Sequence, residues 1–195
     1  MSLVQVQFKT LKLLNLKIYF SYLYTGVNFF FIKFGIQGVK NLIVVTSPSY
    51  LYFSMLHFRF SSSTQSYQLV DIFSYELPTT SLLKQGKRST LTTIIYNLHN
   101  LINYGRLLLF VLRNNNKYKV KSVVNLFPNS NWLEREVSEL FGFFFEGKND
   151  TRNLMLQYGD ISAPFQKYFP SIGLKEIFYN SILDLLTFSD FETQV

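Results

Sequence analysis

Few residues of this 195-residue chain have the types and spacing that catalysis or metal binding requires. The absence of Cys excludes disulfides, cysteine-ligated iron–sulfur clusters and thiol chemistry from this polypeptide. His57 and His99 lie far apart in the sequence, so each is expected to be a packed or surface histidine and not a metal ligand. Ser138 has no histidine near it in the sequence that could activate it as a nucleophile. These observations predict a chain without catalytic or metal-binding residues.

Nucleotide binding and acid–base catalysis also lack a convincing set of residues. The segment 35–38, GIQG, lacks the third glycine and the lysine of phosphate-binding loops, and it predicts a turn. Glu134 and Glu136 could be considered an acid–base pair, but residues two positions apart on a helix project about 200° from each other. We therefore expect this chain to bind no cofactor and to transfer no hydride, electron or acyl group.

One stretch, residues 131–155, combines charged, aromatic and glycine residues more densely than any other part of the chain: NWLEREVSELFGFFFEGKNDTRNLM. Asn131 can cap a helix in which Glu134 occupies the third position, close to a capping box. Gly142 is placed to end this helix. Four apolar residues recur at spacings of three and four, which predicts one buried helix face: Leu133, Val137, Leu140 and Phe141.

The polar residues of this predicted helix leave one acid unpaired. Glu134 lies in the first turn, where the helix dipole favours a carboxylate. Arg135 can reach Glu139 one turn later, so Glu136 has no cation nearby in the sequence. One interpretation is an amphipathic helix with a solvated polar side, which the pattern alone favours. The other is a docking helix whose spare carboxylate meets a basic partner.

The order of these residues resembles the signature of the thirty-kilodalton subunit of respiratory complex I, the NADH:quinone oxidoreductase. That signature is Glu-Arg-Glu, two free positions, an acid, two apolar residues, six free positions, His or Lys, then a basic residue and two apolar ones. The matching positions are Glu134, Arg135, Glu136, Glu139, Leu140, Phe141, Lys148, Arg152, Leu154 and Met155. The resemblance covers roughly residues 42–173, and before the motif it is loose.

Residues beyond the motif follow the tail of the same family with departures. Pro164, Lys167, Phe169 and Pro170 match it. Ser162-Ala163 stands where Gly-His is usual, Gln166 where Arg is usual, Tyr168 where Asp is usual, and Asn153 where a second Arg is usual. The resemblance therefore implies the family's tail with fewer charged contacts.

The resemblance implies a non-catalytic core structural subunit in the peripheral, hydrophilic arm of mitochondrial complex I, on the matrix side of the inner membrane. It implies packing against the forty-nine-kilodalton subunit and the iron–sulfur subunits of the quinone-reducing module. NADH, FMN, iron–sulfur clusters and ubiquinone would be bound elsewhere in the complex. The expected interface residues are Trp132, Glu134, Arg135, Glu136, Glu139, Phe141, Gly142, Lys148, Arg152 and Lys167.

Charge is distributed unevenly along the chain. The first 70 residues contain no acid and six bases, which carry nearly all of the net charge of +7: Lys9, Lys12, Lys17, Lys33, Lys40 and Arg59. Such asymmetry indicates an anionic partner, whether RNA, lipid headgroups or an acidic protein. An organellar RNA-binding or ribosomal protein is thus an alternative function. The equivalent subunit of a plastid NDH or hydrogenase-type complex is another.

The remaining pattern predicts an α+β domain, and hydrophobic content of 48% supports a folded chain. The apolar segment 18–32 is too short to span a membrane and predicts a packed helix. Strands are expected at 42–45, 68–75, 91–98, 106–113 and 119–124, with a helix from Ser47-Pro48 to about His57. These elements predict a two-layer sandwich of a mostly antiparallel sheet of four or five strands with helices on one side.

Three regions follow from this pattern. Residues 1–40 form a basic, acid-free extension that is expected to be helical and apolar, and we expect no presequence in it. Residues 41–145 form the core domain, which ends in the motif helix. Residues 146–195 form an extended arm, because Pro and Gly are frequent there, with a possible final helix over 174–188.

Overall fold

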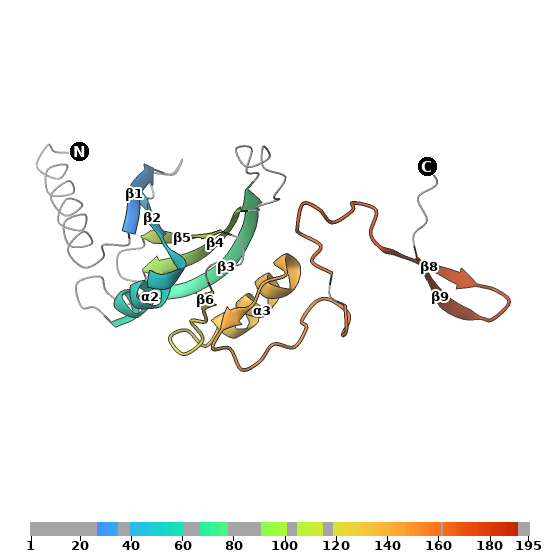
Figure 1. The fold of residues 1–195 in the computed structure, drawn as a ribbon. Coiled ribbons are helices and arrows are strands. Elements are labelled where there is room, and N and C mark those ends of the chain that lie inside the picture. The colour runs from blue at the N-terminus through green and yellow to red at the C-terminus, as the bar shows by residue number, and fades with distance from the viewer. Residues whose placement is uncertain are drawn as a thin grey trace, which may run out of the picture.

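Five strands form one mixed sheet in the computed structural model of the chain (Figure 1). The structure describes residues 27–34, 40–60, 67–77, 91–100, 105–114, 119–160 and 162–190. The strands are β1 (Val27–Phe34), β2 (Lys40–Thr46), β3 (Tyr67–Leu77), β4 (Leu91–Asn100) and β5 (Arg106–Asn114). Their spatial order is β1-β2-β5-β4-β3; only β2 and β5 run parallel, and the other neighbours are antiparallel.

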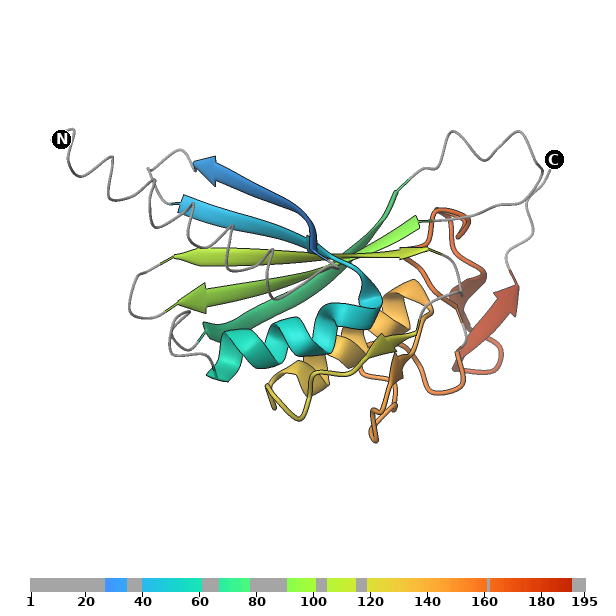
Figure 2. The same ribbon diagram turned by 60° about the vertical axis from the view of Figure 1, so that its left-hand side comes forward.

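The helices cover one face of this sheet (Figure 2). A 3₁₀ turn, η1 (Pro48–Tyr50), leads into α2 (Leu51–Phe60), and the motif helix is α3 (Ser130–Phe141). Because apolar residues recur along each helix at spacings of three and four, their side chains join a single core with the inner strand residues. The helix residues of that core are Leu51, Met55, Phe58, Val137 and Phe141. The predicted two-layer α+β sandwich is thereby confirmed.

The chain beyond the main sheet forms two small strand pairs. β6 (Val120–Lys121) pairs in parallel with β7 (Phe145–Glu146), on either side of α3 in the sequence. After a long irregular arm, β8 (Lys175–Asn180) and β9 (Leu185–Asp190) form an antiparallel hairpin, which lies beyond α3 and away from the sheet (Figure 1). Among the described residues, no helix combines the length and apolar character needed to cross a membrane.

Three sequence-based assignments of secondary structure were wrong. Within the segment 18–32, expected to be helical, residues 27–32 belong to β1, which pairs with β2; Val, Phe and Ile are residue types that favour strands. The strand expected at 119–124 is only β6 and stays outside the main sheet. The helix considered for 174–188 is the β8–β9 hairpin, whose strands contain several residues that favour strands: Ile177, Phe178, Tyr179, Thr187 and Phe188. Residues 1–26, the segment 35–38 and most of 77–88 lie outside the described residues.

Candidate functional site: the motif helix and the arm

α3 begins earlier than the sequence suggested. The backbone N–H groups of Ser130 and Asn131 donate to the carbonyls of Phe127 and Pro128, so the preceding turn runs directly into the helix. Asn129, and not Asn131, therefore takes the N-cap position, and its side chain donates to the Leu69 carbonyl at 2.8 Å instead of capping. This position removes Glu134 from the first turn.

Gly142 ends α3 as expected. It adopts the left-handed conformation with φ of 67°, and its N–H donates to the Ser138 carbonyl at 2.9 Å. The predicted apolar face is also present, since Val137 and Phe141 are buried and Leu133 and Leu140 pack against the core. The helix thus holds its polar side chains in fixed directions above the sheet.

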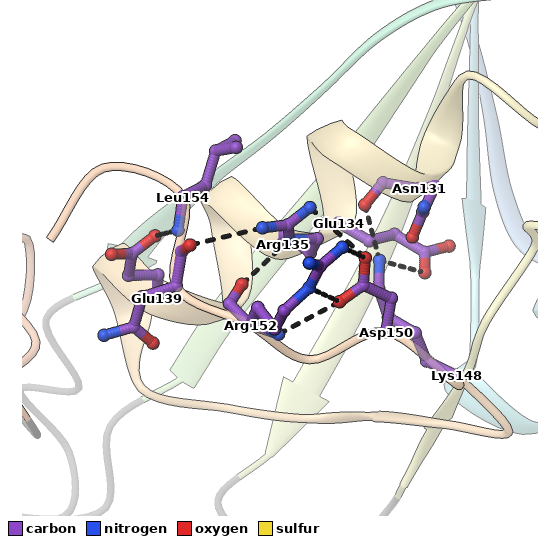
Figure 3. Close-up of polar contacts among 9 residues, drawn as sticks. Asn131, Glu134, Arg135, Glu139, Lys148, Asp150, Arg152 and Leu154 are labelled. Atoms are coloured by element: carbon purple, nitrogen blue, oxygen red, sulfur yellow. Dashed lines mark hydrogen bonds and ion pairs between the residues drawn. The ribbon is translucent and has the colours of Figure 1, made fainter. Parts of the chain in front are cut away.

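Glu134 is fully buried beneath this helix (Figure 3). One carboxylate oxygen accepts hydrogen bonds from Ser122 Oγ at 2.7 Å and from Lys148 Nζ at 3.4 Å, and the other accepts from the Val123 N–H at 2.8 Å. Burial lowers the pKa of Lys148, and the Glu134 carboxylate opposes this shift. Because these partners lie before and after the helix in the sequence, Glu134 links α3 to both neighbouring segments.

Lys148 joins the loop after α3 back to the start of the helix. Its Nζ donates to the Asn131 carbonyl at 2.7 Å in addition to its ion pair with Glu134, and its side chain is nearly inaccessible to solvent. Near this ion pair, Tyr96 of β4 is completely buried. Burial raises the pKa of Tyr96 well above its ordinary value, and the charge of Glu134 adds to the shift. The buried cluster therefore contains the neutral phenol of Tyr96 and one ion pair, Glu134 with Lys148.

Arg135 holds the backbone of the same loop (Figure 3). Its Nε donates to the Arg152 carbonyl at 2.8 Å, and its guanidinium also donates to the Asn153 carbonyl at 3.2 Å. An ion pair with Asp150 at 3.4 Å and a position over the Trp132 ring, 5.5 Å from its centroid, complete its surroundings. Arg135 is thus buried against its own chain and is not paired with Glu139, as the helical spacing had suggested.

Asp150 connects two arginines at the surface. Arg152 donates to it from the backbone N–H and from the side chain, with Nε and Nη2 each 3.0 Å from a carboxylate oxygen. These hydrogen bonds from Arg152, with the charge of Arg135, hold the pKa of Asp150 well below its usual range. The Arg152 side chain itself remains largely exposed.

Glu139 accepts three successive backbone N–H groups of the arm. Leu154 and Met155 donate at 2.8 and 3.0 Å, and Leu156 donates to the other carboxylate oxygen. Partial burial acts to raise the pKa of Glu139, but these three N–H groups and the charge of Arg135 together lower it below its ordinary value. The carboxylate therefore fixes the path of the arm over residues 154–156.

The next part of the arm caps the C-terminal end of α3. The Phe165 N–H donates to the Leu140 carbonyl at 3.0 Å, and Gln166 Nε2 donates to the Phe141 carbonyl. The rings of Phe141 and Phe165 meet edge to face, with centroids 5.7 Å apart. One residue further, the Lys167 N–H donates to Glu76 of β3 at 2.8 Å. Carbonyls that the helix leaves unsatisfied are thus bound by the arm.

The other predicted residues take separate positions. Trp132 is 61% exposed on α3, and Glu136, which is half-buried, has no hydrogen bond or ion pair to another described residue. The Ser138 hydroxyl donates to the Arg135 carbonyl at 2.8 Å. His57 lies on α2 and His99 on β4, and within the described ranges no three His, Asp or Glu side chains are placed to hold a metal.

Sequence reasoning missed the residues that complete this arrangement. Ser122, Asp150 and Gln166 each bind a motif residue, but their partners are 12 to 25 positions away. No periodicity links such positions, since a loop connects them. The short spacing Asp150-x-Arg152 was the only signal, because a side chain in a turn commonly accepts an N–H two residues on.

The arrangement positions a chain segment. Glu134 binds the Val123 N–H, Arg135 binds the Arg152 carbonyl, and Glu139 binds the Leu154 N–H, so each side chain reaches a segment outside the helix. Successive turns of α3 bind successive parts of the following chain. Arg135 binds the loop, Glu139 binds residues 154–156, and the last helix carbonyls bind residues 165 and 166. The motif is therefore a template that guides the arm across one end of the sheet.

Comparison with known proteins relates this arrangement to one family. A family model described as "Respiratory-chain NADH dehydrogenase, 30 Kd subunit" matches residues 44–174. "NADH-ubiquinone oxidoreductase subunit 9" of Paramecium primaurelia is 52% identical over 65 residues, which are 33% of this chain and 31% of the relative. "NADH dehydrogenase [ubiquinone] iron-sulfur protein 3, mitochondrial" of Candida albicans is 30% identical over 139 residues, 71% of this chain and 47% of the relative.

The chain thus spans about a third to a half of the length of these curated relatives. Among solved structures, a chain of the archaeal membrane-bound sulfane sulfur reductase, described as a respiratory membrane complex, has the same fold. The TM-score is 0.55 at 15% sequence identity, and the match covers 72% of this chain and 78% of the other.

Proposed function

The chain belongs to the 30 kDa subunit family of the respiratory-chain NADH dehydrogenase, and from this premise we propose that it is a non-catalytic structural subunit of mitochondrial complex I. It would lie in the peripheral arm, on the matrix side of the inner membrane. It would support the quinone-reducing module, while NADH, FMN, iron–sulfur clusters and ubiquinone are bound by other subunits.

The use of the motif charges supports a structural role. A general acid or base must reach the proton that it transfers, within hydrogen-bond distance or through one water. Glu134 and Lys148 are instead enclosed and paired with each other, and Glu139 is occupied by three N–H groups. Such residues hold the arm in one position, which is the property that a subunit needs when it keeps its neighbours in register.

The observation that carries the proposal is the apolar surface along the motif and the arm. Large side chains there are 60–80% exposed although the arm backbone is bound to α3: Trp132, Phe144, Met155, Tyr158, Phe165 and Tyr168. Aromatic residues dominate the binding energy of protein interfaces, and extensive exposed apolar surface marks sites of protein interaction. A forty-nine-kilodalton-type subunit and the iron–sulfur subunits of the quinone module are the proposed partners.

Interface roles for the predicted residues follow from their exposure. Trp132, Glu136, Arg152 and Lys167 are the members that a partner can contact directly. The other members would act indirectly, by positioning the exposed residues: Glu134, Arg135, Glu139, Phe141, Gly142 and Lys148. We therefore divide the predicted interface residues into two groups, those that contact a partner and those that position the contact residues.

The proposal is tested by isolating the native particle that contains this chain and determining its composition by mass spectrometry. Flavin- and iron–sulfur-containing subunits together with NADH:ubiquinone activity are expected. Ribosomal proteins or RNA in the particle would instead favour the RNA-binding alternative, and a chain recovered free of any NADH-oxidising particle would overturn the proposal.

A variant separates docking from folding. We expect Trp132→Ala to reduce incorporation into the particle by about 30-fold or more, because a central aromatic anchor contributes on the order of 2 kcal/mol or more. The thermal unfolding of the free chain should change only slightly, since the ring is mostly exposed and its contact with Arg135 contributes about 0.5–1 kcal/mol. Phe60→Ala on α2 is the control, because it removes an exposed aromatic that lies away from the motif and the arm. Equal incorporation of both variants would contradict docking through Trp132.

A further inference from the structure

The β8–β9 hairpin has two chemically different faces. Opposite residues of an antiparallel pair lie on the same face, so the pairs Ile177–Phe188 and Tyr179–Leu186 share one side. The other side carries Phe178 and Leu185 among polar residues: Glu176, Asn180, Thr187 and Ser189. One face is therefore a continuous apolar surface of four large side chains.

This apolar face has no cover within the described part of the chain. Ile177, Tyr179, Leu186 and Phe188 are 59%, 60%, 68% and 60% exposed, and the extensive contacts of each strand are with the other strand. An isolated two-stranded hairpin is at best marginally stable in water, and stable sheets bury a face against another layer. The sequence of the hairpin is consequently suited to a bound state.

Charge indicates what kind of molecule supplies that layer. The chain carries a net charge of +7, but within 174–190 the single base Lys175 is outnumbered by three acids: Glu176, Asp184 and Asp190. Lys175 and Asp190 lie opposite each other at the open end, and Asp184 lies in the turn, where it accepts a hydrogen bond from the Tyr179 hydroxyl. Glu176 lies on the opposite face, so Asp184 and Asp190 are the acids at the two ends of the hairpin. The net negative charge of the hairpin as a whole disfavours an anionic lipid surface or RNA and fits a protein surface with basic groups.

We propose that the face formed by Ile177, Tyr179, Leu186 and Phe188 docks onto an apolar patch of a partner protein, and that basic side chains border this patch. The inference rests on the proposed function for the source of the partner, a neighbouring subunit of the complex. The hairpin then supplies a second contact, separate from the surface around Trp132. The opposite face, with Phe178 and Leu185, stays accessible.

Two neighbouring leucines provide a matched test. Leu185 and Leu186 are similarly exposed at 60% and 68%, but they point to opposite faces of the hairpin. The chain has no Cys, so Leu185→Cys or Leu186→Cys introduces the only thiol of this subunit. With the particle assembled, each variant is treated with a maleimide, and the labelling rate of this subunit is compared with that of the free chain.

We expect the thiol of Leu186→Cys to react at least about 10-fold more slowly in the particle than in the free chain, and that of Leu185→Cys to react at a similar rate in both. Equal rates for the two variants in the particle would overturn the proposed docking face. Protection of Leu186→Cys in the free chain by anionic phospholipid vesicles, or by self-association seen in light scattering, would overturn a protein partner in favour of lipid or a second copy.

A substitution pair measures the contribution to binding. Leu186→Ser should lower incorporation into the particle by about 10-fold, as expected for an apolar contact residue at an interface, and Leu185→Ser should leave it near that of the unsubstituted chain. Equal effects would overturn the choice of face. These outcomes differ from a failure of the proposed function, in which the unsubstituted chain itself is not recovered with NADH-oxidising subunits.

Discussion

The carboxylates of α3 show how far neighbouring acids can differ in role. Glu134 is fully buried and Glu136, one half-turn away, is half-buried without a charged partner among the described residues. A buried carboxylate requires both a counter-charge and hydrogen-bond donors, and Glu134 has Lys148, Ser122 Oγ and the Val123 N–H. Glu134 therefore holds the segment before the helix, at Ser122 and Val123, and the segment after it, at Lys148, against each other.

Replacement of this carboxylate should destabilise the fold. We expect Glu134→Ala to lower the free energy of unfolding by about 3–5 kcal/mol, because Lys148 would remain buried without its counter-charge. Urea denaturation of the free chain measures the change. Glu136→Ala, on the same helix, should stay within about 0.5 kcal/mol of the unsubstituted chain. A cost below about 1 kcal/mol for Glu134→Ala would contradict the internal role.

Glu139 makes stability depend on acid pH. Its pKa is lowered in the folded chain from the ordinary value of 4.5, so its contribution is fully present above about pH 4.5 and is lost as the pH falls through the folded pKa. Glu139→Gln should cost about 1–3 kcal/mol at pH 7, since neutral acceptors bind N–H groups less strongly. The difference between the two proteins should shrink below pH 4.5 in denaturation series, and a constant difference would be inconsistent with this assignment.

At the scale of elements, α3 and the arm form one structural unit. Helix side chains bind residues 150–156, and the last helix carbonyls bind Phe165 and Gln166. The arm has little regular structure of its own, so its path depends on these contacts. It follows that a local change at the end of the helix should displace the arm.

Gly142 is the position where this dependence is most direct. A Cβ there would lie 2.9 Å from Gln166 Nε2 and 3.0 Å from the Ala163 Cβ, and φ is 67°. Gly142→Ala should therefore cost backbone strain of about 1–2 kcal/mol and a further steric term. Gly147→Ala, at φ of 80° with no atom near the new Cβ, should cost the strain alone.

The difference between Gly142→Ala and Gly147→Ala measures the steric contact between residue 142 and the arm. Unfolding experiments on both variants should show the larger loss for Gly142→Ala, and limited proteolysis should cleave the segment 157–167 faster in that variant only. Equal losses and equal cleavage would show that the arm does not depend on close packing at Gly142.

At the scale of the whole molecule, the chain divides its apolar residues between two uses. α2 and α3 enclose one continuous core with inner residues of β2, β3, β4 and β5. The arm and hairpin instead expose many of theirs, with Tyr158 74% and Ile182 91% exposed. The arm and the hairpin extend away from the core domain (Figure 1). Their exposed apolar side chains are therefore available to a partner. This division is what a subunit that joins neighbours requires, and both docking tests above depend on it.

The sequence by itself determined the local features. Spacings of three and four defined the buried face of α3, Gly142 marked its end, and runs of β-formers located β2, β3, β4 and β5. These features depend on residues close together in the chain, so periodicity and turn chemistry report them. The fold class and the family signature followed from their order.

Only the tertiary structure decided which charges face inward. Nothing in the spacing distinguishes Glu134 from Glu136, because the partners Ser122 and Lys148 come from segments before and after the helix. It also decided that residues 174–188 pair as strands and that the arm binds the last carbonyls of α3. Such outcomes depend on contacts between distant segments. Burial strengthens the interactions between charges and shifts their pKa values, and it exists only once those segments have packed.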